Sequence, residues 1–486
     1  MIRSVISVIS GFLSLFLPSY PLALVYMLQS TEYQVGPYLR WYWRTNNYAR
    51  VMQRRTLERT RSARLLLMAL RLGMLSQLTF GLFLVYLGSW HAVVGAATFG
   101  LAIIIAYPVI WAHLVVLPLL MGRWFISDPR QSRTIDQSRR IFADFDGLKI
   151  AVAGSYGKTT MKELLATVLS EGRRIAATPA NKNVSTSHAK FAAGLEGDED
   201  ILIIEYGEGA PGDVASFASI TQPTHAVITG LAPAHLDRYK TLRAAGEDIF
   251  AVADYLGANN VYVNDESVSI EPFLHKAYQL FNVSGALGWK TSAIEVGLDG
   301  TSFILQKGER TVKLSSGLVG RHQVGYLAFV AAFALELGLS NKQVIAGAAK
   351  TKPFEHRMQP YQLSGAWIID DTYNGNLEGI RAGTGLLGEL DAKRKIYITP
   401  GLVDQGEETE AVHKEVGRLI AAAKPDLVVL MKNSVTDYIK QGLSAGHFKG
   451  ELRIESNPLD FYTNLSHFVA SGDLVVMQND WTDNYA

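Results

Sequence analysis

The sequence contains no cysteine among its 486 residues. This absence excludes disulfides, thiolate metal sites and cysteine nucleophiles. A surplus of charge is also missing, since the formal net charge is +1. Proteins that bind nucleic acids usually carry a basic surplus, so we expect no nucleic-acid partner. Hydrophobic residues make up 48% of the chain and charged residues 19%, proportions that are typical of folded proteins.

Two long stretches, 4–31 and 72–122, lack Asp, Glu, Lys and Arg entirely. A helix that crosses a membrane needs about 20 apolar residues, so the first stretch can hold one such helix and the second two. The predicted spans are about 5–28, 67–88 and 92–119. The alternative is a cleaved signal peptide followed by buried soluble helices. It is disfavoured because only Arg3 precedes the first apolar run and no clean cleavage site follows it.

Basic residues flank these predicted spans unevenly. Those between the first two spans and after the third are Arg40, Arg44, Arg50, Arg54, Arg55, Arg59, Arg61, Arg64, Arg123, Arg130, Arg133, Arg139 and Arg140. The positive-inside rule therefore predicts a multi-pass protein of the inner or plasma membrane, with its N-terminus outside and everything after residue 120 in the cytoplasm. The segment 32–64 is also rich in Tyr and Trp, which suits either a helix at the lipid headgroups or an ordinary cytoplasmic loop.

Short apolar runs alternate with helical patterns from Gly147 onward. The expected strands lie near 149–153, 201–205, 226–229, 261–264, 367–370, 395–399, 427–430 and 474–477. This alternation predicts an α/β fold with parallel sheets. The pattern breaks near 357–364 and then restarts. The predicted domains are a membrane region at 1–146, a central domain at 147–358 and a smaller C-terminal α/β domain at 359–486.

A glycine-rich turn joins the first of these strands to a helical stretch at 158–170. It reads Gly154-Ser155-Tyr156-Gly157-Lys158-Thr159-Thr160. The usual phosphate loop is G-x-x-x-x-G-K-[ST], and here the glycines stand closer together. The chemistry is the same, because glycines let backbone N–H groups close on phosphate oxygens at a helix N-terminus. Lys158 can reach the β- and γ-phosphates and Thr159 can bind Mg²⁺. The alternative is a strand–turn–helix junction with chance glycines.

Polar residues follow three other expected strands. Glu205 ends an apolar strand, His235 follows the next one, and Asp371 lies in the sequence Asp370-Asp371-Thr372-Tyr373-Asn374. Each also has a purely structural interpretation: Glu205 can cap a strand end, His235 can be a hydrogen-bonded core histidine, and Asp371 can belong to an Asx turn. Open α/β sheets bind ligands at the carboxyl ends of their strands, so their common position downstream of a phosphate loop favours a functional site.

Taken together, these motifs resemble the Mur ligases, the ATP-dependent amide-forming ligases of peptidoglycan assembly. The resemblance covers about residues 149–486 and is carried by four motifs: the loop at 153–160, Pro233-Ala234-His235-Leu236, Gly320-Arg321-His322 and Asp370 to Asn376. Residues 401–417 look like the branch that adds D-alanyl-D-alanine to a UDP-linked muramoyl tripeptide. The resemblance implies a central ATP-binding domain and a Rossmann-like C-terminal domain.

The resemblance also implies a mechanism and a set of site residues. ATP would phosphorylate a substrate carboxylate, and an amine would displace the phosphate, with Mg²⁺ and basic groups neutralising charge. The implied catalytic residues are Lys158, Glu205, His235 and Asp248, and the implied metal ligands are Thr159, Glu205 and His235. The implied nucleotide-binding residues are Gly154, Ser155, Gly157, Lys158, Thr159, Thr160, Asn264, His322, Gln323, Arg357 and Asp371. The last two would close on the nucleotide at the hinge of the C-terminal domain.

The chain departs from the family pattern at the metal site and at the nucleotide base. The family commonly has a carbamylated lysine downstream of Pro-Ala-His-Leu, but this chain has no lysine from Thr241 to His275. In this chain, the position of that lysine falls on Ala245 or Ile249, depending on the alignment. Glu247 or Asp248 can supply a carboxylate instead, or the second metal site is weakened or lost. At the base, Gln323 and Tyr326 stand where asparagines are usual, so Gln323 can pair with adenine or Tyr326 can stack on it.

The family's soluble N-terminal domain, which grips the UDP-sugar, is replaced by the predicted spans. The carboxylate substrate is therefore expected at the membrane, as a lipid-linked muropeptide or another envelope precursor, with an amino acid or dipeptide as the amine. A soluble UDP-linked substrate is the alternative, if 30–64 or 123–146 forms a substitute site. Rival interpretations are a membrane ligase that amidates or extends another peptide or polyglutamate chain, and a nucleotide-binding membrane scaffold without ligase activity.

Overall fold

The computed structural model describes residues 10–31, 33–45, 48, 57–91, 93–122, 124–125, 128–180, 182–233, 236–373, 375–403 and 405–479. The chain divides into two compact units, Met1–Arg133 and Thr134–Ala486. The predicted domain boundaries at 146 and 358 stay predictions.

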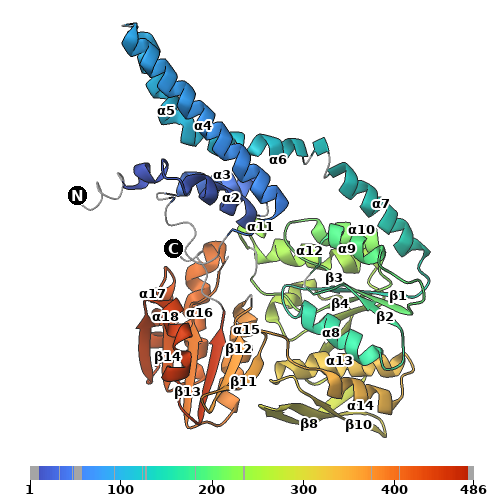
Figure 1. Ribbon diagram of the computed structural model, residues 1–486. Helices are drawn as coiled ribbons and strands as arrows, with labels where there is room; N and C mark the ends of the chain where they lie inside the picture. The colour runs from blue at the N-terminus through green and yellow to red at the C-terminus, as the bar shows by residue number, and fades with distance from the viewer. Residues whose placement is uncertain are drawn as a thin grey trace. The chain divides into compact units, whose positions relative to one another are not determined.

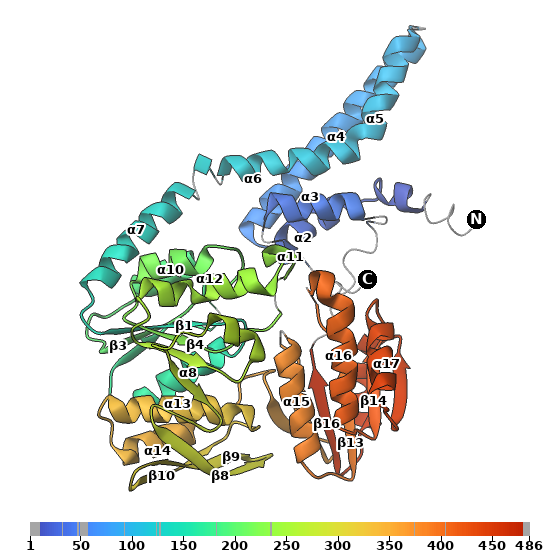
Figure 2. The same ribbon diagram turned by 180° about the vertical axis from the view of Figure 1, so that it is seen from behind.

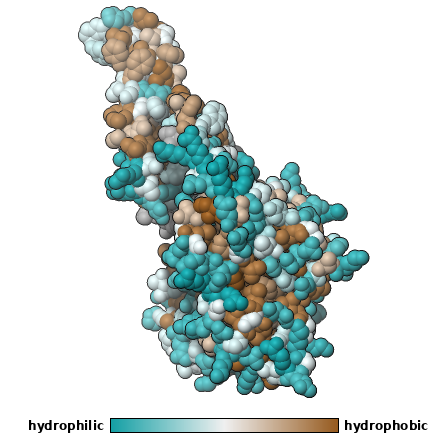
Figure 3. Space-filling view, turned by 90° about the vertical axis from the view of Figure 1, so that its right-hand side faces the viewer, coloured by the Kyte–Doolittle hydropathy of each residue, from teal (hydrophilic) through white to brown (hydrophobic). Residues whose placement is uncertain are grey.

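Two long apolar helices dominate the first unit. Helix α4 spans Arg61–Trp90, α5 spans Val94–Leu114 and α6 spans Val116–Gly122. The stretches Arg61–Trp90 and Val94–Met121 are long and apolar enough to cross a membrane, and only 17% and 22% of their most apolar windows are buried. Brown and pale side chains accordingly gather along the α4–α5 hairpin in Figure 3. Two of the three predicted spans thus correspond to helices of suitable length and exposure.

The first predicted span, 5–28, is not one continuous helix. The chain is helical at 10–14, turns at 15–19 and becomes helical again as α2, Tyr20–Ser30. Pro18 lies in the turn and lacks the N–H that would continue a helix, whereas Pro21 fits the first turn of α2. The 11 residues of α2 are too few to cross a bilayer. Residues 5–9 of this prediction lie outside the described residues.

The helices of the first unit approach closely where side chains are small. A Cβ on Gly100 would lie 2.7 Å from the Gly81 carbonyl oxygen, so α4 and α5 pack almost backbone to backbone. The Tyr38 hydroxyl donates to the Ala112 carbonyl at 2.9 Å. Tyr38 belongs to α3, Val35–Arg44. The predicted headgroup segment is therefore helical over part of its length, and most of 46–56 lies outside the described residues.

The second unit contains a ten-stranded sheet in the order β10-β9-β8-β7-β6-β5-β4-β1-β3-β2. Its strands are β1 Leu148–Ala153, β2 Ile175–Ala177, β3 Ile201–Glu205, β4 His225–Ile228, β5 Val261–Asn264, β6 Gln279–Asn282, β7 Gly285–Ala286, β8 Trp289–Gly297, β9 Gly300–Lys307 and β10 Arg310–Ser316. Strands β2 to β6 and β1 run parallel, and β6 to β10 continue as an antiparallel meander. The four predicted strands are confirmed; the antiparallel extension was not predicted.

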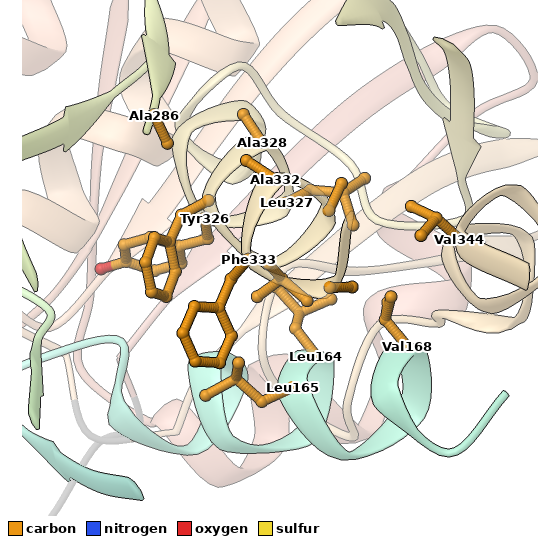
Figure 4. Packing of buried hydrophobic residues seen from close by; sticks show 14 of the residues in the cluster. Leu164, Leu165, Val168, Ala286, Tyr326, Leu327, Ala328, Ala332, Phe333 and Val344 are labelled. Atoms are coloured by element: carbon orange, nitrogen blue, oxygen red, sulfur yellow. The ribbon is translucent and has the colours of Figure 1, made fainter. Parts of the chain in front are cut away.

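Helices cover both faces of this sheet (Figures 1 and 2). They are α8 Lys158–Leu169, α9 Ser185–Ala192, α10 Asp213–Thr221, α11 Leu236–Tyr239, α12 Leu242–Tyr255, α13 His322–Glu336 and α14 Asn341–Lys350, with a 3₁₀ turn at Val268–Phe273. Alternate residues of β1 enter different cores: Ile150 packs with α8 and α13, and Ala151 with α10 and α12. Figure 4 shows α8 side chains such as Leu165 meeting Phe333 of α13.

A second sheet of six strands follows, in the order β11-β12-β16-β13-β14-β15. Its strands are β11 Gln359–Leu363, β12 Ala366–Asp371, β13 Arg394–Thr399, β14 Leu427–Met431, β15 Glu451–Glu455 and β16 Asp473–Gln478. Only β11 is antiparallel to its neighbour. The helices of this part of the chain are α15 Leu377–Glu389, α16 Thr409–Ala422, α17 Thr436–Ala445, α18 Pro458–Thr463 and α19 Leu465–Phe468. Helix α7, Asp128–Asp144, packs Phe142 against the first sheet instead.

Candidate active site

The predicted phosphate loop lies between the buried end of β1 and the start of α8. Gly157 has φ 72° and is the N-cap of α8, and no side chain caps the helix there. A Cβ on Gly157 would lie 2.2 Å from the Tyr326 hydroxyl oxygen, and one on Gly154, at φ 141°, would lie within 2.3 Å of the Thr229 hydroxyl oxygen. Both positions therefore need glycine, and the backbone N–H groups at the helix start are left open to a ligand.

The loop is held in place by the segment that follows β4. The Ser155 N–H donates to the Gly230 carbonyl at 3.0 Å, and the Ser155 hydroxyl accepts from the Ala232 N–H at 2.7 Å. The Tyr326 hydroxyl donates to the Thr229 carbonyl at 2.9 Å. The two bonds of Ser155 hold the loop against the segment after β4, and the bond of Tyr326 holds that segment against α13. Thr160, also predicted at the site, is buried at 8% exposure in the first turn of α8.

Lys158 is paired with a carboxylate that the sequence analysis did not single out. Its Nζ donates to the Gly154 carbonyl at 2.6 Å and to Glu208 Oε2 at 2.5 Å. The two side chains are 11% and 6% exposed. The positive charge predicted to meet phosphate is thus neutralised by Glu208 in the structure.

Glu205 and Thr159 are brought together as the motif interpretation requires. Glu205 Oε1 accepts from the Thr159 hydroxyl at 3.1 Å and from Asn183 Nδ2 at 3.2 Å. Glu205 Oε2 is buried and has no hydrogen-bond donor among the described residues. It lies 3.4 Å from the Nζ of Lys162. This oxygen of Glu205 therefore faces the ammonium group of Lys162 and accepts no hydrogen bond, so it can still take a further donor or a cation.

Lys162 is a second residue that sequence reasoning missed. Its side chain is fully buried, and its Nζ donates to the Thr178 carbonyl at 2.8 Å and to the Ala180 carbonyl. A buried charge is tolerated only when it is paired and hydrogen-bonded, as it is here. The available signal was its position, one helical turn after Lys158 on the face of α8 that packs on the sheet.

The remaining predicted metal-site residues are less informative. His235 lies outside the described residues. Asp248 is 6% exposed; it accepts from the Gly212 N–H at 2.7 Å and from the Tyr239 hydroxyl at 2.7 Å, and burial raises the pKa of its carboxyl. Both its oxygens are occupied, so the geometry favours a structural role over the predicted catalytic one. No cluster of three metal-ligating side chains occurs within the described part of the chain.

Three residues predicted near the nucleotide base differ in what they offer. Asn264 ends β5 and accepts from the Glu266 N–H at 2.9 Å. Gln323 Nε2 donates to His322 Nε2 at 2.8 Å, and burial lowers the pKa of His322 to about 4, which keeps the ring neutral as an acceptor. Gln323 Oε1 is buried without a donor in the described residues. Tyr326 is 5% exposed in the core beside α8 (Figure 4), so stacking on a base is excluded for it.

Arg357 and Asp371 form a separate group at the start of the second sheet. Burial raises the pKa of Asp371 to about 7, although hydrogen bonds from Gln478 and Met358 and the Arg357 charge oppose the rise. Gln478 Nε2 donates to Asp371 Oδ2 at 2.7 Å. The Arg357 guanidinium lies 4.6 Å from the centre of the Tyr373 ring. These contacts tie the segment before β11 to the end of β12.

The region that contains the glycine-rich loop 154–160 is similar to a known protein domain. Residues 152–334 match the Mur ligase middle domain. The chain is 30% identical to the UDP-N-acetylmuramoyl-tripeptide–D-alanyl-D-alanine ligase of Escherichia coli over 58% of this chain and 63% of that protein. The corresponding Synechocystis ligase is 30% identical over 60% and 64%. The chain thus spans less than two thirds of the length of these relatives.

Solved structures share the α/β fold. The chain resembles a MurF structure from Acinetobacter baumannii with a TM-score of 0.62 at 20% identity, covering 72% of this chain and 77% of that one. It also resembles MurF from Thermotoga maritima in complex with ADP, with a TM-score of 0.63 at 23% identity, covering 72% and 80%.

Proposed function

We propose that the chain is an ATP- and Mg²⁺-dependent ligase, because its residues 152–334 match the Mur ligase middle domain. It joins the carboxylate of a peptidoglycan precursor to an amine through an acyl phosphate. The observation that carries the proposal is the hydrogen bond from Thr159 to Glu205 across two adjoining strand ends. It lies beside a loop that needs glycine at 154 and 157 and that accepts a hydrogen bond from Lys158.

The residues present suit both a nucleotide and a metal ion. The hydroxyl of Thr159 and the open Oε2 of Glu205 are hard oxygen donors of the kind Mg²⁺ prefers. Lys158 and the N–H groups of the loop would hold phosphate, and the buried, unpartnered Oε1 of Gln323 matches the amino group of adenine. When bound, ATP and Mg²⁺ supply activation of the carboxylate and neutralisation of the charge that develops.

The other predicted residues take supporting roles in this proposal. His235 would complete the metal site beside Glu205. Asn264 would hold the turn after β5 near the base through its bond to Glu266. Arg357 and Asp371 would couple the second sheet to nucleotide binding, so that closure excludes water from the reacting groups.

We infer that the substrates belong to the class named in the relatives, a muramoyl-peptide carboxylate and D-alanyl-D-alanine. The α4–α5 hairpin would anchor the chain in a membrane, because large apolar side chains such as Phe83 and Phe99 are more than half exposed along it. A membrane anchor makes a lipid-linked precursor the alternative to a UDP-linked one. Extraction of membranes at alkaline pH tests the anchor: an anchored chain stays in the pellet.

The direct test is phosphate release from ATP by the full chain purified in detergent. Each candidate carboxylate, UDP-linked or lipid-linked, is supplied with and without D-alanyl-D-alanine. Release should require both substrates and should be lost in Lys158→Ala. The matched control is Lys307→Ala, which removes a lysine from an exposed pair with Glu336 at 2.7 Å. If nucleotide binds but no substrate pair stimulates release, the chain is a scaffold and the proposal fails.

A further inference from the structure

The position at which Mur ligases commonly carry a carbamylated lysine has no anionic group in this chain. Ala245 and Ile249 are 2% and 0% exposed and apolar. Asp248 already accepts two hydrogen bonds. Glu247 is exposed and pairs with Arg243 at 3.0 Å one turn away. Neither Glu247 nor Asp248, the two carboxylates beside this position, is therefore uncommitted.

Glu208 is a nearly buried carboxylate on the segment that follows β3. It follows Glu205 by three residues at the end of β3, and its side chain is 6% exposed. The residues directly after it reach α11, because the Gly209 carbonyl accepts from Arg238 at 3.4 Å and the Ala210 carbonyl accepts from Tyr239 at 3.3 Å. Glu208 thus belongs to a segment that joins the phosphate loop to the helix after which the usual lysine would stand.

Glu208 is paired with Lys158, the residue whose positive charge a bound nucleotide would need. Its Oε2 lies 2.5 Å from the Nζ of Lys158. Phosphate and Glu208 must compete for Lys158, since each would neutralise the same ammonium group. Among the described residues Lys158 is the cation paired with Glu208. An almost buried carboxylate that loses this partner becomes costly, and a divalent cation would remove that cost. Glu205, three residues earlier, presents a buried oxygen that accepts no hydrogen bond in the described residues, although the Nζ of Lys162 lies 3.4 Å away.

We propose that Glu208 exchanges partners when nucleotide binds. Without nucleotide it neutralises Lys158; with nucleotide it releases Lys158 to the phosphates and becomes a ligand of a divalent cation shared with Glu205. It would thereby supply the anionic oxygen that a carbamylated lysine supplies in the family. This inference rests on the proposed function, because it presupposes that the loop binds a nucleotide.

The test measures binding rather than turnover, on the full chain in detergent. ADP affinity is measured by calorimetry with EDTA, and Mn²⁺ binding by electron paramagnetic resonance with saturating ADP. Glu208→Gln should bind metal-free ADP several-fold more tightly, because the competitor for Lys158 is gone. The same variant should bind Mn²⁺ at least about tenfold more weakly, a loss of about 1.4 kcal/mol. The matched control, Glu336→Gln, should change neither affinity.

A second variant tests the exchange from the other side. Lys158→Met removes the cation that pairs with Glu208 in the described residues. Mn²⁺ should therefore bind more tightly to this variant than to the wild type when no nucleotide is present. Unchanged Mn²⁺ affinity in Glu208→Gln overturns the proposal, as does weaker binding of both ligands, which would mark a purely structural role. If Glu247→Gln loses Mn²⁺ instead, the ligand lies on α12. Failure of the wild type to bind ADP at all would refute the proposed function itself.

Discussion

Replacing Lys162 by Met should loosen the chain around Glu205 far more than the loss of a surface lysine does. The Nζ of Lys162 is fully buried, donates to the Thr178 carbonyl at 2.8 Å and lies 3.4 Å from Glu205 Oε2. Removal of one partner from a buried ion pair costs about 3–5 kcal/mol. Thr159 and Asn183 still donate to the other oxygen of Glu205, so we expect the lower end of that range.

Hydrogen exchange is the appropriate measurement, because a chain with several cores does not unfold in one step. The segment around β2 is held to α8 by Lys162 through the carbonyls of Thr178 and Ala180. A local loss of about 3 kcal/mol corresponds to exchange about a hundredfold faster in that segment. The matched control is Lys307→Met, whose exposed pair with Glu336 is worth less than about 1 kcal/mol.

A double mutant separates the ion pair from the packing of the lysine stem. Glu205→Gln removes the charge that Lys162 would leave unpaired, so Lys162→Met should cost about 1–3 kcal/mol less in that background. Equal costs in both backgrounds would show that the pair is not coupled. Exchange near β2 that is no faster than in the Lys307→Met control would refute the reasoning about the buried charge.

Three further outcomes are expected. Gly157→Ala should destabilise the loop by about 3 kcal/mol and weaken nucleotide binding, because positive φ and overlap with the Tyr326 hydroxyl add together. Gly212→Ala, at φ 92° with open space around it, should cost only about 1–2 kcal/mol, and local hydrogen exchange measures both losses. Burial raises the Asp371 pKa from 3.8 to about 7, so between these pH values the folded chain holds a proton that the unfolded chain has lost. The free energy of unfolding should therefore fall as pH rises across that window, by up to about 1.4 kcal/mol per pH unit. Asp371→Asn should abolish this slope in pH-dependent unfolding, and an unchanged slope would assign it to another group. Gly100→Leu should separate α4 from α5 and reduce the monodisperse fraction on gel filtration, whereas Gly95→Leu, with no atom within 4 Å of its Cβ, should behave as wild type.

Local patterns were sufficient where a structural requirement is local. The strand at 201–205 is an apolar run that is buried throughout, and the glycines at 154 and 157 carry the positive φ values that the loop needs. The meander from β6 to β10 was missed because its strands are half-exposed and lack the apolar runs of the parallel strands. The helix expected over the first predicted span is interrupted at 15–19, because composition counts apolar residues without regard to Pro18, which lies in that turn.

The candidate site likewise has features that follow from local sequence and others that depend on tertiary contacts. The sequence by itself determined the phosphate loop, the carboxylate of Glu205 and the two long apolar helices, because each depends on neighbouring residues along the chain. Only the tertiary structure decided that Glu208 neutralises Lys158, that Lys162 supports Glu205 and that Tyr326 belongs to the core. Those contacts join strand ends and helices that are distant in sequence, and their energies depend on burial, which no local pattern fixes.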